Sequence, residues 1–165
     1  AALAGAQIDV NLKGVLHTLH PLLPRMLRRR QGQIALMSSI AGLVPLPDSM
    51  AYGASKAALV YYGRALRQHL AGTGLRVSVV CPGFVTSPMS ARYSGWKPLE
   101  MPPERAARIV ARGLRRNRAV IAFPAALAFA ARIGAILPET LRHAAMRPFG
   151  FTIARMPADD GPPPA

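Results

Sequence analysis

Residues 34–56 read IALMSSIAGLVPLPDSMAYGASK. The apolar run at 34–37 has the length and composition of a buried parallel strand. Two prolines and a glycine exclude regular structure from residues 40–50, which are predicted to form a loop. An alanine-rich segment with a helical period then runs over residues 51–70. The stretch therefore predicts a strand, a loop and a helix in succession.

The same alternation extends to both sides of this stretch. Apolar residues at spacings of three and four predict an amphipathic helix over residues 6–30, bent at Pro21 and Pro24. Apolar strands that alternate with helices are typical of an α/β fold in which helices cover a parallel sheet. Further strands are predicted at residues 76–81 and 119–123, and further helices at residues 104–116 and 125–147.

The composition limits the classes of protein. The chain has 165 residues, a formal net charge of +14 and 51% hydrophobic residues, which suits one domain with a core and excludes disorder along the whole chain. We predict that the domain covers residues 1–147 and that residues 148–165 are a mobile tail. Cys81 is the one cysteine, so no internal disulfide can form and a cytoplasmic location is expected. The most continuous apolar stretch, residues 119–131, is shorter than the about 20 residues that cross a bilayer.

The positive charge has two interpretations. Runs such as residues 28–30 and 115–118 are typical of solvated helix ends, where cations offset the helix dipole. The alternative is a basic, non-catalytic module that binds nucleic acid or an anionic membrane surface, and the arginine-flanked apolar segment 119–147 suits a peripheral membrane contact. Nucleic acid is not expected as a partner, because its binding grooves interleave cations with exposed aromatics, and the aromatic residues here are 6% of the chain and lie apart from the arginines.

Polar side chains follow the first predicted strand and reappear on the helix after it. Ligands of parallel α/β sheets bind beyond the carboxyl ends of the strands, where Ser38 and Ser39 lie. Tyr52 and Lys56 are four residues apart, so their side chains share one face of a helix. A nearby ammonium lowers the pKa of a phenol from about 10, and a lowering by about three units takes about 4 kcal/mol. Tyr52 is therefore a candidate acid or base toward an alcohol or a carbonyl, and Ser39 a hydrogen-bond donor to the same oxygen.

Four motifs occur in one order along the chain: VNLKG at residues 10–14, SSIAG at 38–42, AYGASK at 51–56 and PGFVTSPM at 82–89. Together they resemble the C-terminal part of the short-chain dehydrogenase/reductase family. The resemblance implies a three-layer, doubly wound, Rossmann-like α/β fold, of which this chain would hold only the last three strands and their helices. The family's glycine-rich pyrophosphate turn has no counterpart here, so the chain alone is expected to be inactive.

The resemblance also implies a role for each matching residue. The activity would be that of an NAD(P)-dependent oxidoreductase, which interconverts an alcohol and a ketone or aldehyde by hydride transfer. Tyr52 would be the general acid/base, and Ser39 would polarise the substrate carbonyl. Lys56 would lower the pKa of Tyr52 and bind the nicotinamide ribose. Asn11 would hold the water that connects Lys56 to solvent.

The resemblance extends to the cofactor. Pro82, Gly83 and Val85 would lie against the nicotinamide of NAD or NADP. Where the family commonly has a threonine, this chain has Ser87 with Thr86 beside it, and either hydroxyl matches that position.

The resemblance also places a substrate lid at residues 88–102. Met89, Tyr93 and Trp96 would offer an apolar wall beside Ser39, which favours an apolar alcohol or ketone as the substrate. Helices in the centre of this family usually form contacts between subunits, so a homodimer or homotetramer is expected.

No metal site is predicted. His17 and His20 lie three residues apart, but no third ligand stands at a useful spacing. Cys81, at the end of a predicted strand, is expected to be a small core residue.

Overall fold

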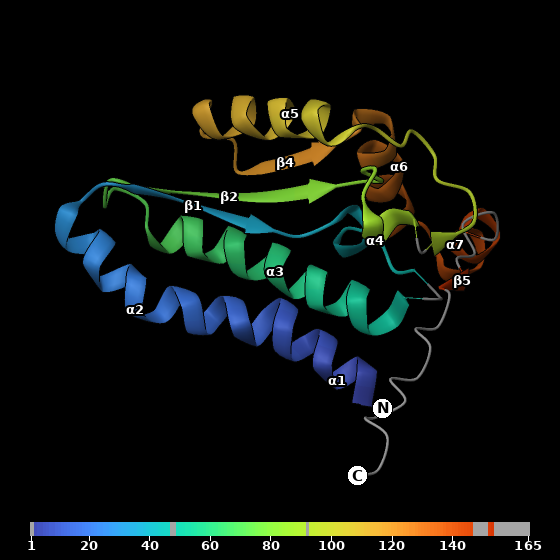
Figure 1. The fold of residues 1–165 in the computed structure, drawn as a ribbon, viewed down its shortest axis with the longest axis horizontal. Coiled ribbons are helices and arrows are strands. Elements are labelled where there is room, and N and C mark those ends of the chain that lie inside the picture. Colours follow the sequence, from blue (N-terminus) through green and yellow to red (C-terminus); the bar gives the residue numbers. More distant parts are fainter. Residues whose placement is uncertain (1, 47–48, 92, 147–151, 154–165) are drawn as a thin grey trace, which may run out of the picture.

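A parallel three-stranded sheet forms the centre of the molecule (Figure 1). The computed structural model describes residues 2–46, 49–91, 93–146 and 152–153. In the sheet, β1 (Gly32–Met37) pairs with β2 (Leu75–Pro82), and β2 pairs with β4 (Val120–Phe123). Both pairings are parallel, and the chain crosses over through a helix each time. The predicted α/β class is therefore confirmed.

Helices cover both faces of this sheet and give three layers. In Figure 1, α2 and α3 lie on one face and α5 on the other, while α6 stands beside the carboxyl end of β4. The bounds of the helices are α1 (Ala2–Ile8), α2 (Gly14–Arg29), α3 (Met50–His69), α5 (Pro103–Arg115), α6 (Ala125–Ile136) and α7 (Glu139–Met146). The bounds of α3 and α5 fall within one residue of the predicted ones, and the predicted helical stretch 125–147 holds α6 and α7. Among the described residues, no helix is long and apolar enough to cross a membrane.

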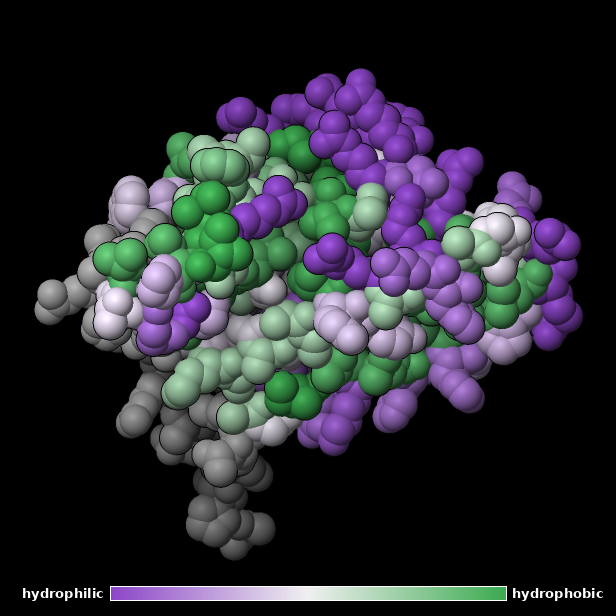
Figure 2. Space-filling model, turned by 180° about the vertical axis from the view of Figure 1, so that it is seen from behind, coloured by the Kyte–Doolittle hydropathy of each residue, from purple (hydrophilic) through white to green (hydrophobic). Residues whose placement is uncertain are grey.

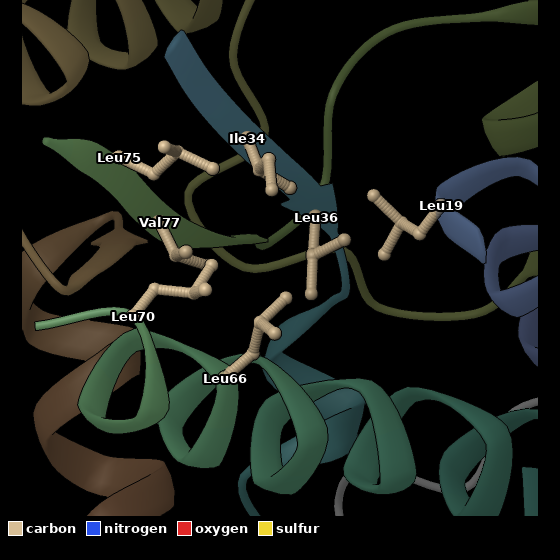
Figure 3. Close-up of a cluster of buried hydrophobic side chains, with 7 residues drawn as sticks. All are labelled: Leu19, Ile34, Leu36, Leu66, Leu70, Leu75 and Val77. Carbon is tan, nitrogen blue, oxygen red and sulfur yellow. The ribbon is translucent and has the colours of Figure 1, made fainter. Parts of the chain in front are cut away.

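The core under β1 and β2 fixes α2 and α3 against the sheet. Seven buried side chains form it (Figure 3): Leu19, Ile34, Leu36, Leu66, Leu70, Leu75 and Val77. Burying each of the larger ones stabilises the fold by about 1.5–3 kcal/mol. Gly63 of α3 brings the helix especially close, because a Cβ there would lie 2.4 Å from Val79 and 2.8 Å from Leu36. The position of α3 relative to the sheet is therefore set tightly.

The first predicted helix differs from the expectation. Instead of one α-helix over residues 6–30, the helix contains a π-helical turn, η1 (Asp9–Lys13), between α1 and α2. The backbone N–H of Gly14 there donates to the carbonyl of Asp9, five residues earlier. The helix continues across Pro21 and Pro24. A π-turn of this kind holds one residue more than an α-turn and often marks a functional site.

The two predicted loops contain short regular elements. Within residues 40–50, a 3-10 turn, η2 (Ile40–Gly42), follows β1. Within residues 88–102, α4 (Pro88–Ala91) precedes β3 (Tyr93–Ser94), which pairs antiparallel with β5 (Thr152–Ile153). These last two residues belong to the segment 148–165 that was predicted as a mobile tail. The remainder of that segment lies outside the described residues.

Candidate active site

A cavity of about 730 Å³ opens at the carboxyl ends of β1 and β2. Its wall contains eight of the predicted site residues: Ser39, Tyr52, Lys56, Pro82, Gly83, Val85, Ser87 and Met89. Two other predicted residues, Asn11 and Trp96, are not in the wall, and the side chain of Trp96 is 59% exposed. The side chain of Tyr93 lies outside the described part of the structure. The predicted catalytic residues other than Asn11 thus share one cavity, and of the two described side chains of the predicted apolar wall, that of Met89 lines this cavity and that of Trp96 does not.

The turn after β1 holds the two serines in different environments. Ser38 continues the sheet, since its N–H donates to the carbonyl of Val80 at 2.8 Å, and its buried hydroxyl donates to the carbonyl of Lys56 at 2.7 Å. Ser39 caps η2, and its hydroxyl accepts the N–H of Ala41 at 3.2 Å. The same hydroxyl donates to the carbonyl of Pro82 over 3.4 Å, which is long for a hydrogen bond. Ser38 is therefore structural, and Ser39 has a weakly engaged hydroxyl in the cavity wall.

Two glycines let η2 pack directly on the backbone of α3. A Cβ on Gly42 would lie 2.6 Å from the carbonyl carbon of Lys56 and 2.7 Å from its oxygen. A Cβ on Gly53 would lie 3.3 Å from the carbonyl oxygen of Ala41. Since these neighbours are backbone atoms, no side chain can move aside to make room. The backbone that carries Ser39 is therefore held against the helix that carries Tyr52 and Lys56.

The amine of Lys56 lies close to the Tyr52 ring on the shared face of α3. The distance from Nζ of Lys56 to the centre of that ring is 5.6 Å. Nζ also donates to the carbonyl of Met37, the last residue of β1, at 3.1 Å. Burial lowers the pKa of Lys56, because a desolvated ammonium is disfavoured. The predicted proximity of amine and phenol is thus present.

Asn11 connects the π-turn to α3 from outside the cavity. Its Nδ2 donates to the hydroxyl of Ser55 at 3.2 Å, and that hydroxyl donates to the carbonyl of Tyr52 at 2.7 Å. Ser55 is fully buried and precedes Lys56 directly in the chain. Asn11 therefore reaches the Tyr52–Lys56 pair through the backbone of α3.

Thr86 and Ser87, the two candidates for one cofactor position, differ in their relation to the cavity. The hydroxyl of Thr86 donates to the carbonyl of Met101 at 3.4 Å, and its N–H donates to the same oxygen at 2.9 Å. Thr86 does not contribute to the cavity wall, whereas Ser87 does. The hydroxyl of Ser87 accepts the N–H of Ser90 at 3.0 Å and so begins α4. Of the two hydroxyls, only that of Ser87 belongs to the cavity.

Sequence reasoning missed a polar cluster that fastens α4. Ser90 is buried, lines the cavity, and donates its hydroxyl to Oε1 of Glu100 at 2.7 Å. The amine of Lys97 donates to the carbonyl of Ser90. Since Lys97 and Glu100 follow Ser90 by seven and ten positions in an irregular segment, no periodicity in the sequence could have paired them with it. Sequence reasoning also missed the apolar contribution of α6, which adds Leu127, Ala130 and Ala131 to the wall.

Cys81, His17 and His20 do not line this cavity. Cys81 is completely buried, and burial raises the pKa of its thiol to about 11, so it is the small core residue that was predicted. Among the residues that the structure describes, no group of three or more His, Cys, Asp or Glu side chains could hold a metal ion.

The fold and the cavity at the carboxyl ends of its strands define a Rossmann-like α/β protein. The chain belongs to the short-chain dehydrogenase family, since the family model described as short chain dehydrogenase matches residues 4–98. This confirms the family resemblance of the four sequence motifs.

Relatives and solved structures agree with this family. An uncharacterized oxidoreductase of Myxococcus xanthus (strain DK1622) is 39% identical over 140 residues, which are 85% of this chain and 55% of the relative. Oxidoreductase UcpA of Escherichia coli (strain K12) is 42% identical over 84 residues, which are 50% of this chain and 32% of the relative. A short chain dehydrogenase from Burkholderia cenocepacia J2315, in complex with NADP, superposes with a TM-score of 0.72 at 26% identity, over 87% of this chain and 59% of that one. The chain thus spans about half or less of the curated relatives.

Proposed function

We propose that the complete protein is an NAD(P)-dependent oxidoreductase that interconverts an alcohol and a ketone or aldehyde, with Tyr52 as the general acid/base. One observation carries the proposal: Ser39 from the turn after β1 lines one cavity with Tyr52 and Lys56 of α3, at the carboxyl ends of the strands. The family to which the chain belongs supports the same reaction class.

Tyr52 would move the proton of the reaction. An unperturbed phenol has a pKa of about 10 and is a poor base at neutral pH. The Lys56 amine, 5.6 Å from the centre of the ring, favours the phenolate through its charge. In the oxidising direction Tyr52 would accept the hydroxyl proton of the alcohol, and in the reducing direction it would return that proton to the carbonyl oxygen.

Ser39 would orient and polarise the substrate oxygen. Its hydroxyl is engaged by Pro82 only over a 3.4 Å contact, so it can turn to a substrate oxygen at small cost. The proposed path for protons between Lys56 and solvent would depend on Asn11 indirectly, since its Nδ2 donates to Ser55, the residue before Lys56, while the Lys56 amine donates to Met37. Asn11 would then act as a positioning residue.

The residues at one end of the cavity fit a nicotinamide. Pro82, Gly83, Val85 and Ser87 line the wall next to Lys56, which has an amine to offer a ribose hydroxyl. Neighbouring structures were solved with NADP, NADPH or NAD, and we therefore propose NAD or NADP for this protein. Bound there, the cofactor would take the hydride from the carbinol carbon or supply it to the carbonyl carbon.

The remainder of the wall favours an apolar substrate. Ile40, Val44, Leu46, Met89 and Leu127 line the cavity, and the polar side chains of its wall include those of Ser39, Tyr52 and Lys56. Pockets of this kind bind mostly through apolar contact and fix orientation with a few polar groups. We therefore propose an apolar alcohol or ketone that carries one oxygen to Tyr52.

The outer face of α2 and α3 suits the homodimer or homotetramer that was predicted. The ring of Tyr61 is 80% exposed, and a groove lined by Leu16, Leu23 and Tyr62, among others, lies between the two helices. Apolar side chains at such a surface favour association with a second copy. The single cysteine supports a cytoplasmic location for this oligomer.

Replacement of Tyr52 tests the reaction. In the complete protein, Tyr52→Phe should lower kcat with apolar secondary alcohols and NAD or NADP by at least about 100-fold, since general acid/base catalysis supplies that much. Tyr61→Phe, on the same helix but outside the cavity, is the matched control and should keep full turnover. Circular dichroism should show the same fold for both variants. Full turnover in Tyr52→Phe would contradict the proposal.

A further inference from the structure

The outward face of α6 carries a stripe of large apolar side chains. Phe129, Ile133 and Ile136 are spaced by four and three residues, so they share one face of the helix. They are 66%, 41% and 78% exposed, and Leu141 at the start of α7 adds a fourth exposed side chain at 57%. Large side chains in such a row are unusual on a surface that faces only water.

The opposite face of the same helix belongs to the cavity. Leu127, Ala130 and Ala131 line the candidate active site, and Ala128 and Ala131 pack in a core cluster with Ile40. The inward face already accounts for the packing of α6 against the domain. Among the described residues, the packing of α6 against the cavity and the core therefore uses its inward face and not the outward stripe.

Positive charge borders the stripe. Residues 103–142 contain eight arginines and two glutamates. Within the described part of the chain, Arg142 is the one of these arginines that forms a salt bridge, with Glu139. Figure 2 shows the apolar surface over the end of the molecule where α6 lies, next to the hydrophilic surface of α5. Apolar and cationic groups thus face the same side of the molecule.

We propose that the outward face of α6, with the arginines of α5 and Arg132 beside it, docks on an anionic lipid membrane. A helix with Phe and Ile on one side and arginines nearby binds a membrane interface by burying its apolar side chains, and the cations attract anionic headgroups. This is the peripheral contact that the sequence predicted for segment 119–147, now limited to one face of one helix and to the start of α7.

A second copy of the chain is the less suitable occupant. In a two-fold dimer each patch meets itself, so the arginines around the stripe would approach arginines of the other subunit. Like charges brought together in this way oppose association. A membrane surface with negative headgroups instead complements the positive charge of α5 and Arg132.

Vesicle flotation of the complete protein tests the docking surface. The protein should float with vesicles of phosphatidylcholine and phosphatidylglycerol and stay behind with phosphatidylcholine alone. The triple variant Phe129→Ser, Ile133→Ser, Ile136→Ser should partition roughly a thousandfold less, because each of the three side chains contributes about a tenfold factor when buried. Arg132→Gln should lower partitioning about fivefold, and added salt should weaken binding of the parent protein.

The controls separate this surface from other causes. Tyr61→Ser removes an exposed aromatic ring on the far side of the sheet and should leave flotation unchanged. None of the three substituted residues lines the cavity, so the triple variant should keep its circular dichroism spectrum and its turnover, whatever the reaction is. Flotation of the triple variant with unchanged affinity would overturn the proposal. So would a failure of the parent protein to float, or a change from dimer to monomer in the triple variant without any vesicle binding.

Discussion

The two sides of the cavity are held by different kinds of contact. On the side of α3, glycines allow backbone to touch backbone, and buried hydroxyls such as those of Ser38 and Ser55 join η2, α3 and the π-turn. On the side of α4, the wall depends on Ser90, Lys97 and Glu100, which join a short helix to an irregular segment.

This difference suggests that the α3 side carries out proton transfer and that the α4 side contacts the substrate. The α3 side holds all the groups proposed for proton transfer, and its backbone contacts leave little freedom to move. The α4 side contributes Ser87, Met89 and Ser90 to the wall and is fastened through side chains that another sequence could alter without disturbing the core. We therefore expect changes on the α3 side to affect turnover, and changes on the α4 side to affect substrate affinity.

On the α3 side of the cavity, the largest loss of turnover is expected from Lys56→Met. Loss of the amine beside Tyr52 should lower kcat by at least about tenfold, as expected when an acid/base group loses its tuning charge. Lys13→Met is the control, because Lys13 is exposed and pairs with Asp9 away from the cavity. Unchanged kcat in Lys56→Met would remove the proposed role of the ammonium.

Stability of the same variant should depend on pH in a defined direction. Burial lowers the pKa of Lys56 below its ordinary 10.5, so the unfolded chain binds this proton more tightly than the folded protein does. Its contribution therefore opposes folding below the folded pKa and disappears as the pH rises toward 10.5. Lys56→Met should have the higher Tm at pH 7, and the difference should shrink in melts at higher pH. A difference that grows with pH would contradict the direction of the shift.

Gly42→Ala should be next in size. The added Cβ would meet the backbone of Lys56 at 2.6 Å, and overpacking of this kind typically costs about 1–3 kcal/mol. Because Ser39 and Tyr52 would move apart, turnover should fall along with stability. Gly5→Ala is the matched control, since a Cβ at Gly5 meets nothing within 4 Å. Denaturant unfolding and kcat measured together would check both effects, and a fully stable, fully active Gly42→Ala would contradict the close packing.

Asn11→Ala should have a smaller effect on stability, and it tests whether the π-turn contributes to the proton path. Loss of its hydrogen bond to Ser55 should lower the free energy of unfolding by about 1 kcal/mol. If Asn11 also positions the proton path, the pH profile of kcat should shift. Thr18→Ala, which loses an exposed hydrogen bond on the same helix, should leave that profile unchanged. An unaltered profile in Asn11→Ala would limit the residue to a structural role.

Ser90→Ala should show the smallest effect. It tests directly whether the α4 side of the cavity determines substrate affinity and the α3 side determines turnover. Without the hydrogen bond to Glu100, α4 should be held less firmly, and KM should rise by about fivefold, as for one hydrogen bond, while kcat stays within about twofold. Glu100→Gln keeps an acceptor oxygen and should retain most of the affinity. A loss of kcat instead of affinity in Ser90→Ala would place α4 with the catalytic side.

The sequence was informative wherever a local pattern decides the structure. Strands β1, β2 and β4 were predictable because buried parallel strands are apolar throughout, and Tyr52 and Lys56 were predictable because four residues make about one helical turn. Contacts between distant segments left no local pattern. The pairing of Ser90 with Glu100, the inward face of α6 and the exposed position of Trp96 depend on how irregular segments fold over the sheet. The π-turn at Asp9–Lys13 likewise has no signature in the spacing of apolar residues.

Because of the π-turn, the side chains of α1 point in directions that a continuous α-helix through α2 would not give them. An α-helix advances about 100° for each residue, so one additional residue in the turn rotates everything on its N-terminal side relative to α2. Deleting a single residue from Asp9–Lys13 would return the helix to one phase and swing α1 around its own axis, while Leu19 stayed in the core. The amide of Asn11 would then point away from Ser55, although the residues of α2 would keep their positions against the sheet. Inserting a residue in α1 would not undo this deletion, because an insertion before Asn11 leaves the orientation of Asn11 relative to α2 unchanged.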